Sequence, residues 1–118
     1  MTSTSPTWDC TTTTGLTLNA GTSTISMGGT GTRNFRGGGL TYWNVVQAGT
    51  TSLQFTGSNT FNSISNSTQP TTIRFTSGTT QTVTNFNVNG TAGNLATINS
   101  ITAGSAATLS KASGTVSC

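Results

Sequence analysis

The sequence has no histidine and no glutamate, and its only acidic side chain is that of Asp9. Without an imidazole, neither a serine–histidine nor a cysteine–histidine catalytic pair can be assembled. Glycoside hydrolysis by its usual route needs two carboxylates, and a calcium site needs several acidic oxygens. A zinc ion would be left with Asp9, Cys10 and Cys118, which offer no imidazole and no CxxC spacing. We therefore expect no enzymatic activity, no bound metal and no cofactor.

Charge of either sign is scarce, at 4% of the 118 residues, with a net charge of +3. The basic residues are Arg33, Arg36, Arg74 and Lys111. A nucleic-acid surface normally carries clustered Lys and Arg, so we expect no nucleic-acid partner. A lone arginine acting as the base of a β-helical lyase is conceivable, and Arg74 is the best candidate. The simpler interpretation makes Arg74 an outward residue on a strand, between inward Ile73 and Phe75.

Long apolar runs are also missing, and none approaches the roughly 18 residues of a membrane span. The opening "MTSTSPTWDC" lacks the basic region and apolar stretch of a signal peptide. We nevertheless expect an extracellular or virion-associated protein. It would then leave the cell by another route, such as virion release, or with a leader outside this sequence.

The residues that are abundant favour strands and turns. The chain contains 30 Thr, 15 Ser, 11 Asn and 15 Gly. Threonine is a good strand former, and glycine and asparagine are good turn formers. Phenylalanine, valine and isoleucine recur along the chain, whereas disordered chains contain few aromatic or β-branched residues. This composition predicts a folded, all-β domain.

An internal repeat of about 20 residues runs through the chain. Leu53 and Phe55 in "LQF" are followed one repeat later by Ile73 and Phe75 in "IRF". A pair of apolar residues three apart recurs at a similar interval, in "YWNV", "FNSI" and "VTNF". Two inward residues with two outward ones between them suit a strand that bends at a corner. Gly-containing turns such as "TGSNT" and "TSGTT" separate the segments.

These features predict a right-handed parallel β-helix, a β-solenoid of about five turns with about 20–22 residues and three short strands per turn. Residues 1–118 would form a single solenoid domain, with 1–15 as an N-terminal cap or lead-in strand and 16–118 as stacked turns. An antiparallel sandwich is the alternative, although such a fold does not need a period of about 20 residues.

The repeat frame also predicts which side chains point inward. Leu53, Ile73 and Leu95 would stack as one ladder, and Phe55 over Phe75 as an aromatic one. The "GGG" run before Leu40 would form a tight corner. Trp8 would cover the first turn. The inward candidates are Leu16, Leu18, Ile25, Met27, Phe35, Leu40, Tyr42, Val45, Leu53, Phe55, Phe61, Ile64, Ile73, Phe75, Val83, Phe86, Leu95, Ile98, Leu109 and Val116.

The chain contains the phrases "FRGGGLTYWNVV", "FTGSNTFNSISN", "TTQTVTNFNVNGTAGNLATINS" and "GSAATLSKASGTVS". These four phrases resemble repeat segments of large β-helical proteins of bacteriophage and metagenomic origin, which are usually taken as virion fibre or surface proteins. The resemblance covers roughly residues 35–117. It implies a structural role and transfers no catalytic residue, because that family has no well-defined catalytic motif.

Three functions are compatible with such a solenoid. The first is a structural module that stacks head-to-tail into an extracellular or virion-associated fibre. The second is a carbohydrate- or receptor-binding module of a tail fibre or adhesin, for which Trp43 beside inward Tyr42 would be an exposed sugar-stacking residue. The third is ice binding, which is weakened because the Thr-x-Thr motifs do not fall at one repeat position.

The two cysteines, Cys10 and Cys118, lie near opposite ends of the predicted stack. Bridged cysteines need Cα atoms within about 7 Å, so a disulfide within one chain is not expected. In a head-to-tail filament, Cys118 of one copy would lie near Cys10 of the next, and an intermolecular disulfide could join them. The alternative is a pair of free thiols.

Overall fold

The computed structural model describes residues 7–117 and contains no helix among them. The expectation of an all-β domain is confirmed. The strands, in chain order, are β1 (Thr7–Asp9), β2 (Thr24–Gly29), β3 (Arg33–Arg36), β4 (Thr41–Gly49), β5 (Ser52–Thr56), β6 (Thr60–Asn66), β7 (Thr71–Phe75), β8 (Thr80–Asn87), β9 (Ala96–Ser100), β10 (Thr108–Ser110) and β11 (Val116–Ser117).

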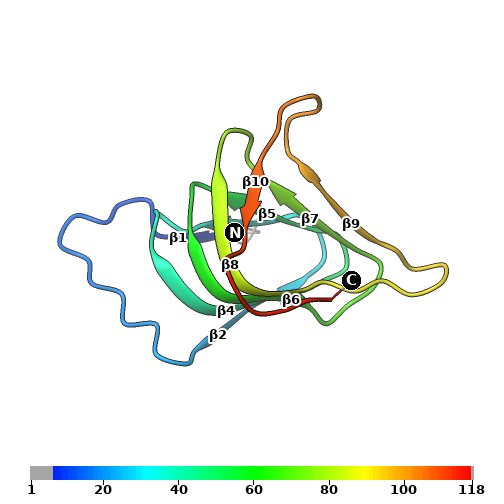
Figure 1. Ribbon diagram of the computed structural model, residues 1–118, viewed down its shortest axis with the longest axis horizontal. Helices are drawn as coiled ribbons and strands as arrows, with labels where there is room; N and C mark the ends of the chain where they lie inside the picture. Colours follow the sequence, from blue (N-terminus) through cyan, green and yellow to red (C-terminus); the bar gives the residue numbers. More distant parts are fainter. Residues whose placement is uncertain (1–6, 118) are drawn as a thin grey trace.

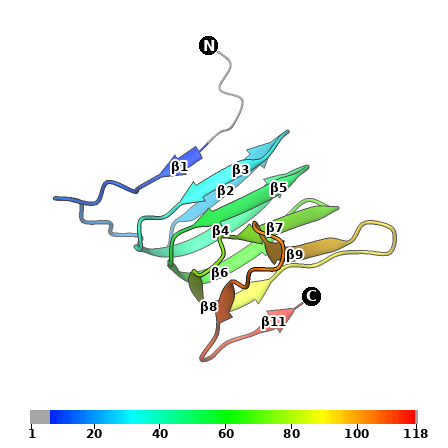
Figure 2. The same ribbon diagram turned by 90° about the horizontal axis from the view of Figure 1, so that it is seen from above.

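The strands form two parallel sheets between which the chain alternates (Figure 1). Sheet A has the order β1-β3-β5-β7-β9, and sheet B the order β10-β8-β6-β4-β2, with β11 also paired to β8. Seen from above, strands of the same sheet lie side by side in steps from the N-terminal to the C-terminal end (Figure 2). Parallel pairing of strands that are two apart in the chain fits a solenoid and rules out the antiparallel sandwich.

The register of the central strands follows the repeat in the sequence. In sheet A, Phe35 pairs with Phe55 and Phe55 with Phe75, so each pairing advances the chain by one repeat. In sheet B, Phe61 pairs with Val83 in the same way. Phenylalanine is therefore repeated at one position of successive strands of sheet A, and its rings pack against each other at a tilt, with centroid distances of 5.4 and 5.5 Å. The predicted aromatic ladder is confirmed and extends one strand further, to Phe35.

Longer connections interrupt the repeat near both ends. Residues 10–23 join β1 to β2 as a loop that projects from the sheets (Figure 1). Between β8 and β9, Thr91 and Asn94 close a small antiparallel turn through two backbone hydrogen bonds of 2.9 Å. Because of this insertion, Ile73 pairs with Ile98, and not with Leu95. The predicted Leu53–Ile73–Leu95 ladder is therefore wrong at its third member.

The core lies between the two sheets and is made largely of the predicted residues. Leu18, Ile25 and Leu40 are only partly buried beside it. Val88 is fully buried although the repeat frame did not select it. The buried apolar residues are Met27, Phe35, Tyr42, Val45, Leu53, Phe55, Phe61, Ile64, Ile73, Phe75, Val83, Phe86 and Val88.

Five predicted core residues are exposed, and each lies outside the central strands. Leu16 is in the projecting 10–23 loop, and Leu95 follows the inserted turn. Ile98, Leu109 and Val116 belong to the last strands, β9 to β11, which have no further described strand beside them to cover these side chains. The alternation of side chains was predicted correctly, but burial also requires a neighbouring strand.

The predicted corner is present within β4. Tyr42 and Val45 are both buried, whereas Trp43 between them is exposed and Asn44 is half-buried. β4, β6 and β8 bend along their length as a result (Figure 1). A bent strand takes the place of two short ones, so each repeat contributes two strands, and not the expected three.

The glycine run before Leu40 forms the expected tight corner. The Leu40 amide donates to the Gly37 carbonyl oxygen at 3.2 Å, which closes a turn. Gly38 and Gly39 have φ angles of +64° and +77°, a region that favours glycine. The Tyr42 hydroxyl also donates to the Gly37 carbonyl, at 2.9 Å. The corner is thus fixed to the core by a buried phenol.

Candidate functional site

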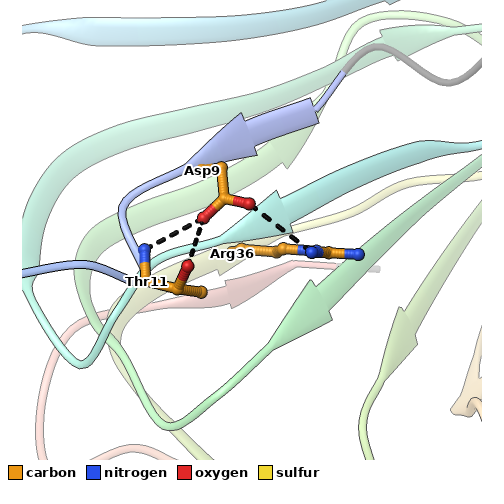
Figure 3. A network of polar contacts seen from close by, with 3 residues as sticks. All are labelled: Asp9, Thr11 and Arg36. Atoms are coloured by element: carbon orange, nitrogen blue, oxygen red, sulfur yellow. Dashed lines mark hydrogen bonds and ion pairs between the residues drawn. The ribbon is translucent and has the colours of Figure 1, made fainter.

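Asp9, the only acidic side chain, lies at the end of β1 and forms a local surface contact (Figure 3). Its carboxylate accepts hydrogen bonds from the Thr11 amide at 3.0 Å and the Thr11 hydroxyl at 2.6 Å, and pairs with the Arg36 guanidinium at 3.5 Å. The hydrogen bonds from Thr11, with a smaller contribution from Arg36, lower the pKa of Asp9 below its usual value. This arrangement closes the loop after β1 and keeps the carboxylate ionised.

No group of three histidine, cysteine, aspartate or glutamate side chains gathers anywhere in residues 7–117. The Asp9 carboxylate has no second acidic group beside it, because the sequence contains none. A base paired with an acid, as in hydrolysis by two carboxylates, therefore cannot be assembled around it.

Arg74 lies on β7 between Gln54 of β5 and Asn99 of β9, in register with both. It is half-buried, and its Nε makes no hydrogen bond with the described residues. It borders an open hollow of about 650 Å³ that is otherwise lined by Asn99, Ser100 and the 101–106 loop. The outward orientation expected for Arg74 is confirmed. No acidic side chain lines the hollow, so nothing there partners an arginine base.

Trp43 is 39% exposed on the outer surface of sheet B, as predicted from its place beside inward Tyr42. Asn62 lies beside it on the neighbouring strand β6, and Thr84 holds the same position on β8, one strand further, since Tyr42 pairs with Phe61 and Phe61 with Val83. Trp8, in contrast, is half-buried and stacks on Phe35 at a centroid distance of 6.2 Å. The expectation that Trp8 covers the first turn is confirmed.

Cys10 is a half-buried free thiol directly after β1. Its backbone amide donates to the Arg36 carbonyl oxygen at 2.8 Å, so Cys10 is held beside the end of β3. Cys118 lies outside the described residues. The proposed link between the two cysteines therefore stays a prediction.

A buried stack of amide side chains was missed by the sequence reasoning. Asn59 and Gln81 are 2% and 0% exposed, and the Asn59 Nδ2 donates to the Gln81 Oε1 at 3.1 Å. The Asn59 Oδ1 accepts from the Gly39 amide at 3.1 Å, and the Gln81 Nε2 donates to the Gly57 carbonyl at 2.6 Å. The signal in the sequence was that the repeat position held by Leu40 is occupied by Asn59 and Gln81 in the next two repeats. Their role is to satisfy the backbone of successive corners.

A column of exposed threonines was also missed. Thr41 pairs with Thr60 and Thr60 with Thr82, and all three side chains are exposed on the outer face of sheet B. The search for Thr-x-Thr motifs along the chain could not find this column, because its members lie a full repeat apart. Two residues further on, the corresponding positions hold Trp43, Asn62 and Thr84, so the regular threonine array of an ice-binding face is not formed.

Both ends of the sheets are hollowed. At the N-terminal end a hollow of about 300 Å³ is lined by the apolar side chains of Trp8, Ile25 and Met27, and also by the charged Arg33. At the C-terminal end one of about 340 Å³ is lined by Val88, Leu95 and others. These hollows lie where the space between the sheets opens beyond the last described strands.

Comparison with known families, curated proteins and solved structures gave no match to a family model, to a curated relative or to a solved structure. The resemblance to β-helical virion fibre proteins therefore remains a hypothesis based on the quoted phrases. In residues 7–117 no helix is long and apolar enough to cross a membrane.

Proposed function

We propose that the chain is a non-enzymatic structural module of an extracellular or virion-associated fibre. Its fold would be a right-handed parallel β-helix of about five turns, with about 20–22 residues in a regular turn. The alternation of the chain between two parallel sheets supports the solenoid. Right-handedness is supported by the strong preference of parallel strand crossovers for that hand. The modules would stack head-to-tail.

The observation that carries this proposal is that one internal ladder in each sheet ends in an exposed apolar residue. In sheet B, Val45 pairs with Ile64, Ile64 with Phe86, and Phe86 with Val116, which is 58% exposed. In sheet A, the last inward position is Ile98, which is 46% exposed. A strand that continued either sheet with the same alternation would cover these side chains.

A second copy of the chain offers strands of this kind at its other end. There, Ile25 of β2 occupies the first position of the ladder that ends at Val116, and it is only half-buried. Trp8 of β1, also half-buried, begins the neighbouring phenylalanine ladder of sheet A. Both strands lie at the edges of their sheets among the described residues, and an edge strand is a template for pairing with another chain. Contact between unlike ends repeats from copy to copy and builds an open filament.

A disulfide between Cys118 of one copy and Cys10 of the next could strengthen each junction. Cys10 is a free thiol held at the N-terminal end of sheet A. Under oxidising, non-reducing electrophoresis we expect a ladder of covalent multimers that Cys118→Ser reduces to monomer. A faster-migrating oxidised monomer would instead place both cysteines together within one chain and contradict the linear stack.

Stacking is tested by placing a charge at the proposed junction. Ile98→Lys puts an ammonium group on the inward-facing side of the edge strand β9, where the next copy would have to bury it. Light scattering over a concentration series should show growing assemblies for the unmodified chain and monomers for Ile98→Lys. The control is Thr97→Lys, one residue earlier on the outward side, which should still assemble. Equal loss in both variants, or no assembly of the unmodified chain, would contradict the proposal.

A further inference from the structure

The two sheets differ sharply in charge. The strands of sheet A carry Asp9, Arg33, Arg36 and Arg74, whereas no charged residue occurs in any strand of sheet B. Lys111 follows β10 and donates to the Ser113 carbonyl oxygen. The outer surface of sheet B is therefore neutral, and a ligand for it must be recognised by shape, stacking and hydrogen bonding, without a counter-charge.

Two columns of outward side chains cross the middle of this surface. One consists of Thr41, Thr60 and Thr82 on β4, β6 and β8. The other lies two residues further along the same strands and consists of Trp43, Asn62 and Thr84. Parallel strands are about 4.8 Å apart, so each column repeats at that distance across the sheet. We call these six residues the Trp43 face.

The polar groups of the Trp43 face are available for a ligand. The hydroxyls of its four threonines make no hydrogen bond with the described residues, and neither does the indole Nε1 of Trp43. Asn62 is held in place, because its Nδ2 donates to the Asn44 Oδ1 at 3.1 Å, which leaves its Oδ1 free to accept. The face thus combines an exposed aromatic ring on a central strand with hydroxyl and amide groups at regular spacing.

Trp43 is also unlike the other exposed large apolar residues. Leu16, Leu95, Ile98, Ile101, Leu109 and Val116 are aliphatic and lie in connecting segments or in the last strands of the sheets. Trp43 lies in a central strand with paired neighbours on both sides, so neither an end-to-end contact nor the core accounts for its exposure. An exposed indole presents a large, rigid surface together with a hydrogen-bond donor.

We propose that the Trp43 face binds a neutral carbohydrate chain. One sugar ring would lie flat against the indole, with its C–H groups toward the aromatic surface. Its hydroxyls, and those of the adjoining ring, would exchange hydrogen bonds with Asn62 and the threonine hydroxyls. A sugar ring is close in length to the strand spacing, so successive rings can meet successive strands. Acidic sugars are not favoured, because the face has no cation to pair with them.

This site does not depend on stacking, because it lies on the side of the molecule and not at its ends. The probe is an array of immobilised oligosaccharides of glucose, galactose, mannose and N-acetylglucosamine, with uronic-acid oligosaccharides beside them. We expect binding to at least one neutral series and none to the acidic series. Trp43→Ala should weaken that binding at least tenfold, and Trp43→Phe, which keeps an aromatic surface, should retain part of it.

The controls separate recognition from folding. Leu95→Ala removes another exposed apolar side chain, far from the face in the chain, and should bind like the unmodified protein. Thermal melts of Trp43→Ala should show a folded protein. Thr60→Lys, which places a bulky charge in the middle of the threonine column, should weaken binding. Binding only to acidic oligosaccharides, no binding to any neutral series, or neutral binding that survives Trp43→Ala would each overturn the proposal.

Discussion

At the scale of single residues, the centre of the molecule is held by aromatic rings. Phe55 is fully buried, and its ring centroid lies 5.4 Å from those of Phe35 and Phe61 and 5.5 Å from that of Phe75. Aromatic pairs of this kind stabilise by about 0.5–1.5 kcal/mol beyond the area that they bury. Phe55 therefore joins three successive strands of sheet A to sheet B.

Replacement of Phe55 by alanine should lower the free energy of unfolding by about 3–5 kcal/mol, because it leaves a cavity between the sheets. Gln54→Ala is the control, since this neighbouring side chain points outward on β5 and should change stability by less than about 0.5 kcal/mol. Denaturant unfolding measures both. Similar losses from the two substitutions would contradict the assignment of inward and outward positions.

A second residue-scale prediction concerns Tyr42, the only tyrosine. Burial raises the pKa of its phenol to about 12. The neutral phenol is thus favoured in the folded state, so its contribution to stability is fully present below the unfolded pKa of about 10 and is lost as the pH rises from about 10 to about 12. We expect thermal stability to fall over this interval, and Tyr42→Phe to remove most of that dependence on pH.

The same substitution has a cost at neutral pH, because the Tyr42 hydroxyl donates to the Gly37 carbonyl and accepts from the Trp8 indole. A loss of about 1 kcal/mol per hydrogen bond is expected there. A fall in stability above pH 10 that is unchanged in Tyr42→Phe would show that another group is responsible. At the acid end, the lowered pKa of Asp9 means that its contribution is present above its unfolded pKa and is lost as the pH falls through its folded pKa.

At the scale of strands and turns, the sequence predicted the regular part of the fold well. The i, i+3 apolar pairs located the bends of β4, β6 and β8, and the glycine run located a corner. The sequence pattern failed where insertions change the repeat. Leu95 fits the alternation, but the turn closed by Thr91 and Asn94 moves it out of register and gives its place to Ile98. Once the length of a repeat changes, the sequence pattern alone cannot decide which of two nearby apolar residues is in register with the preceding strand.

The candidate site was less predictable than the fold. The exposure of Trp43 followed from its place next to Tyr42, a neighbour in the sequence. The threonine column that completes the Trp43 face joins residues on different strands, and its register depends on the length of each turn. The amide pair of Asn59 and Gln81 also joins residues on different repeats. In addition, both side chains are polar, so their composition alone would place them on the surface.

The corner of Gly37 to Gly39 gives a prediction for one turn. A Cβ at Gly38 would lie 2.0 Å from the Cys10 carbonyl oxygen, in a backbone region that already disfavours side chains. Gly38→Ala should therefore displace the segment after β1 and cost about 1–3 kcal/mol more than backbone strain alone. Gly57→Ala is the matched control: its φ is +80°, but a Cβ there would meet nothing within 4 Å. Equal losses of stability in both variants, measured by thermal unfolding, would show that close packing of Cys10 against this corner is not important.

At the scale of the whole molecule, the strands of both sheets follow one another in steps from the N-terminal to the C-terminal end (Figure 2). Cohesion comes from parallel pairing and from the stacked side chains between the sheets. Apolar side chains remain exposed along the last strands, and the proposed head-to-tail contact would continue both features from one copy to the next. The lateral Trp43 face would then be repeated along the filament, and many weak carbohydrate contacts could act together.

The most direct test of this account is electron microscopy of the purified, unmodified chain over a rising concentration series, with diffraction from any filaments that form. We predict unbranched filaments that lengthen with concentration. Their strands should lie across the filament, which gives a repeat of about 4.8 Å along its axis. Single compact particles at every concentration, or filaments whose strand repeat lies across the axis, would contradict the head-to-tail solenoid.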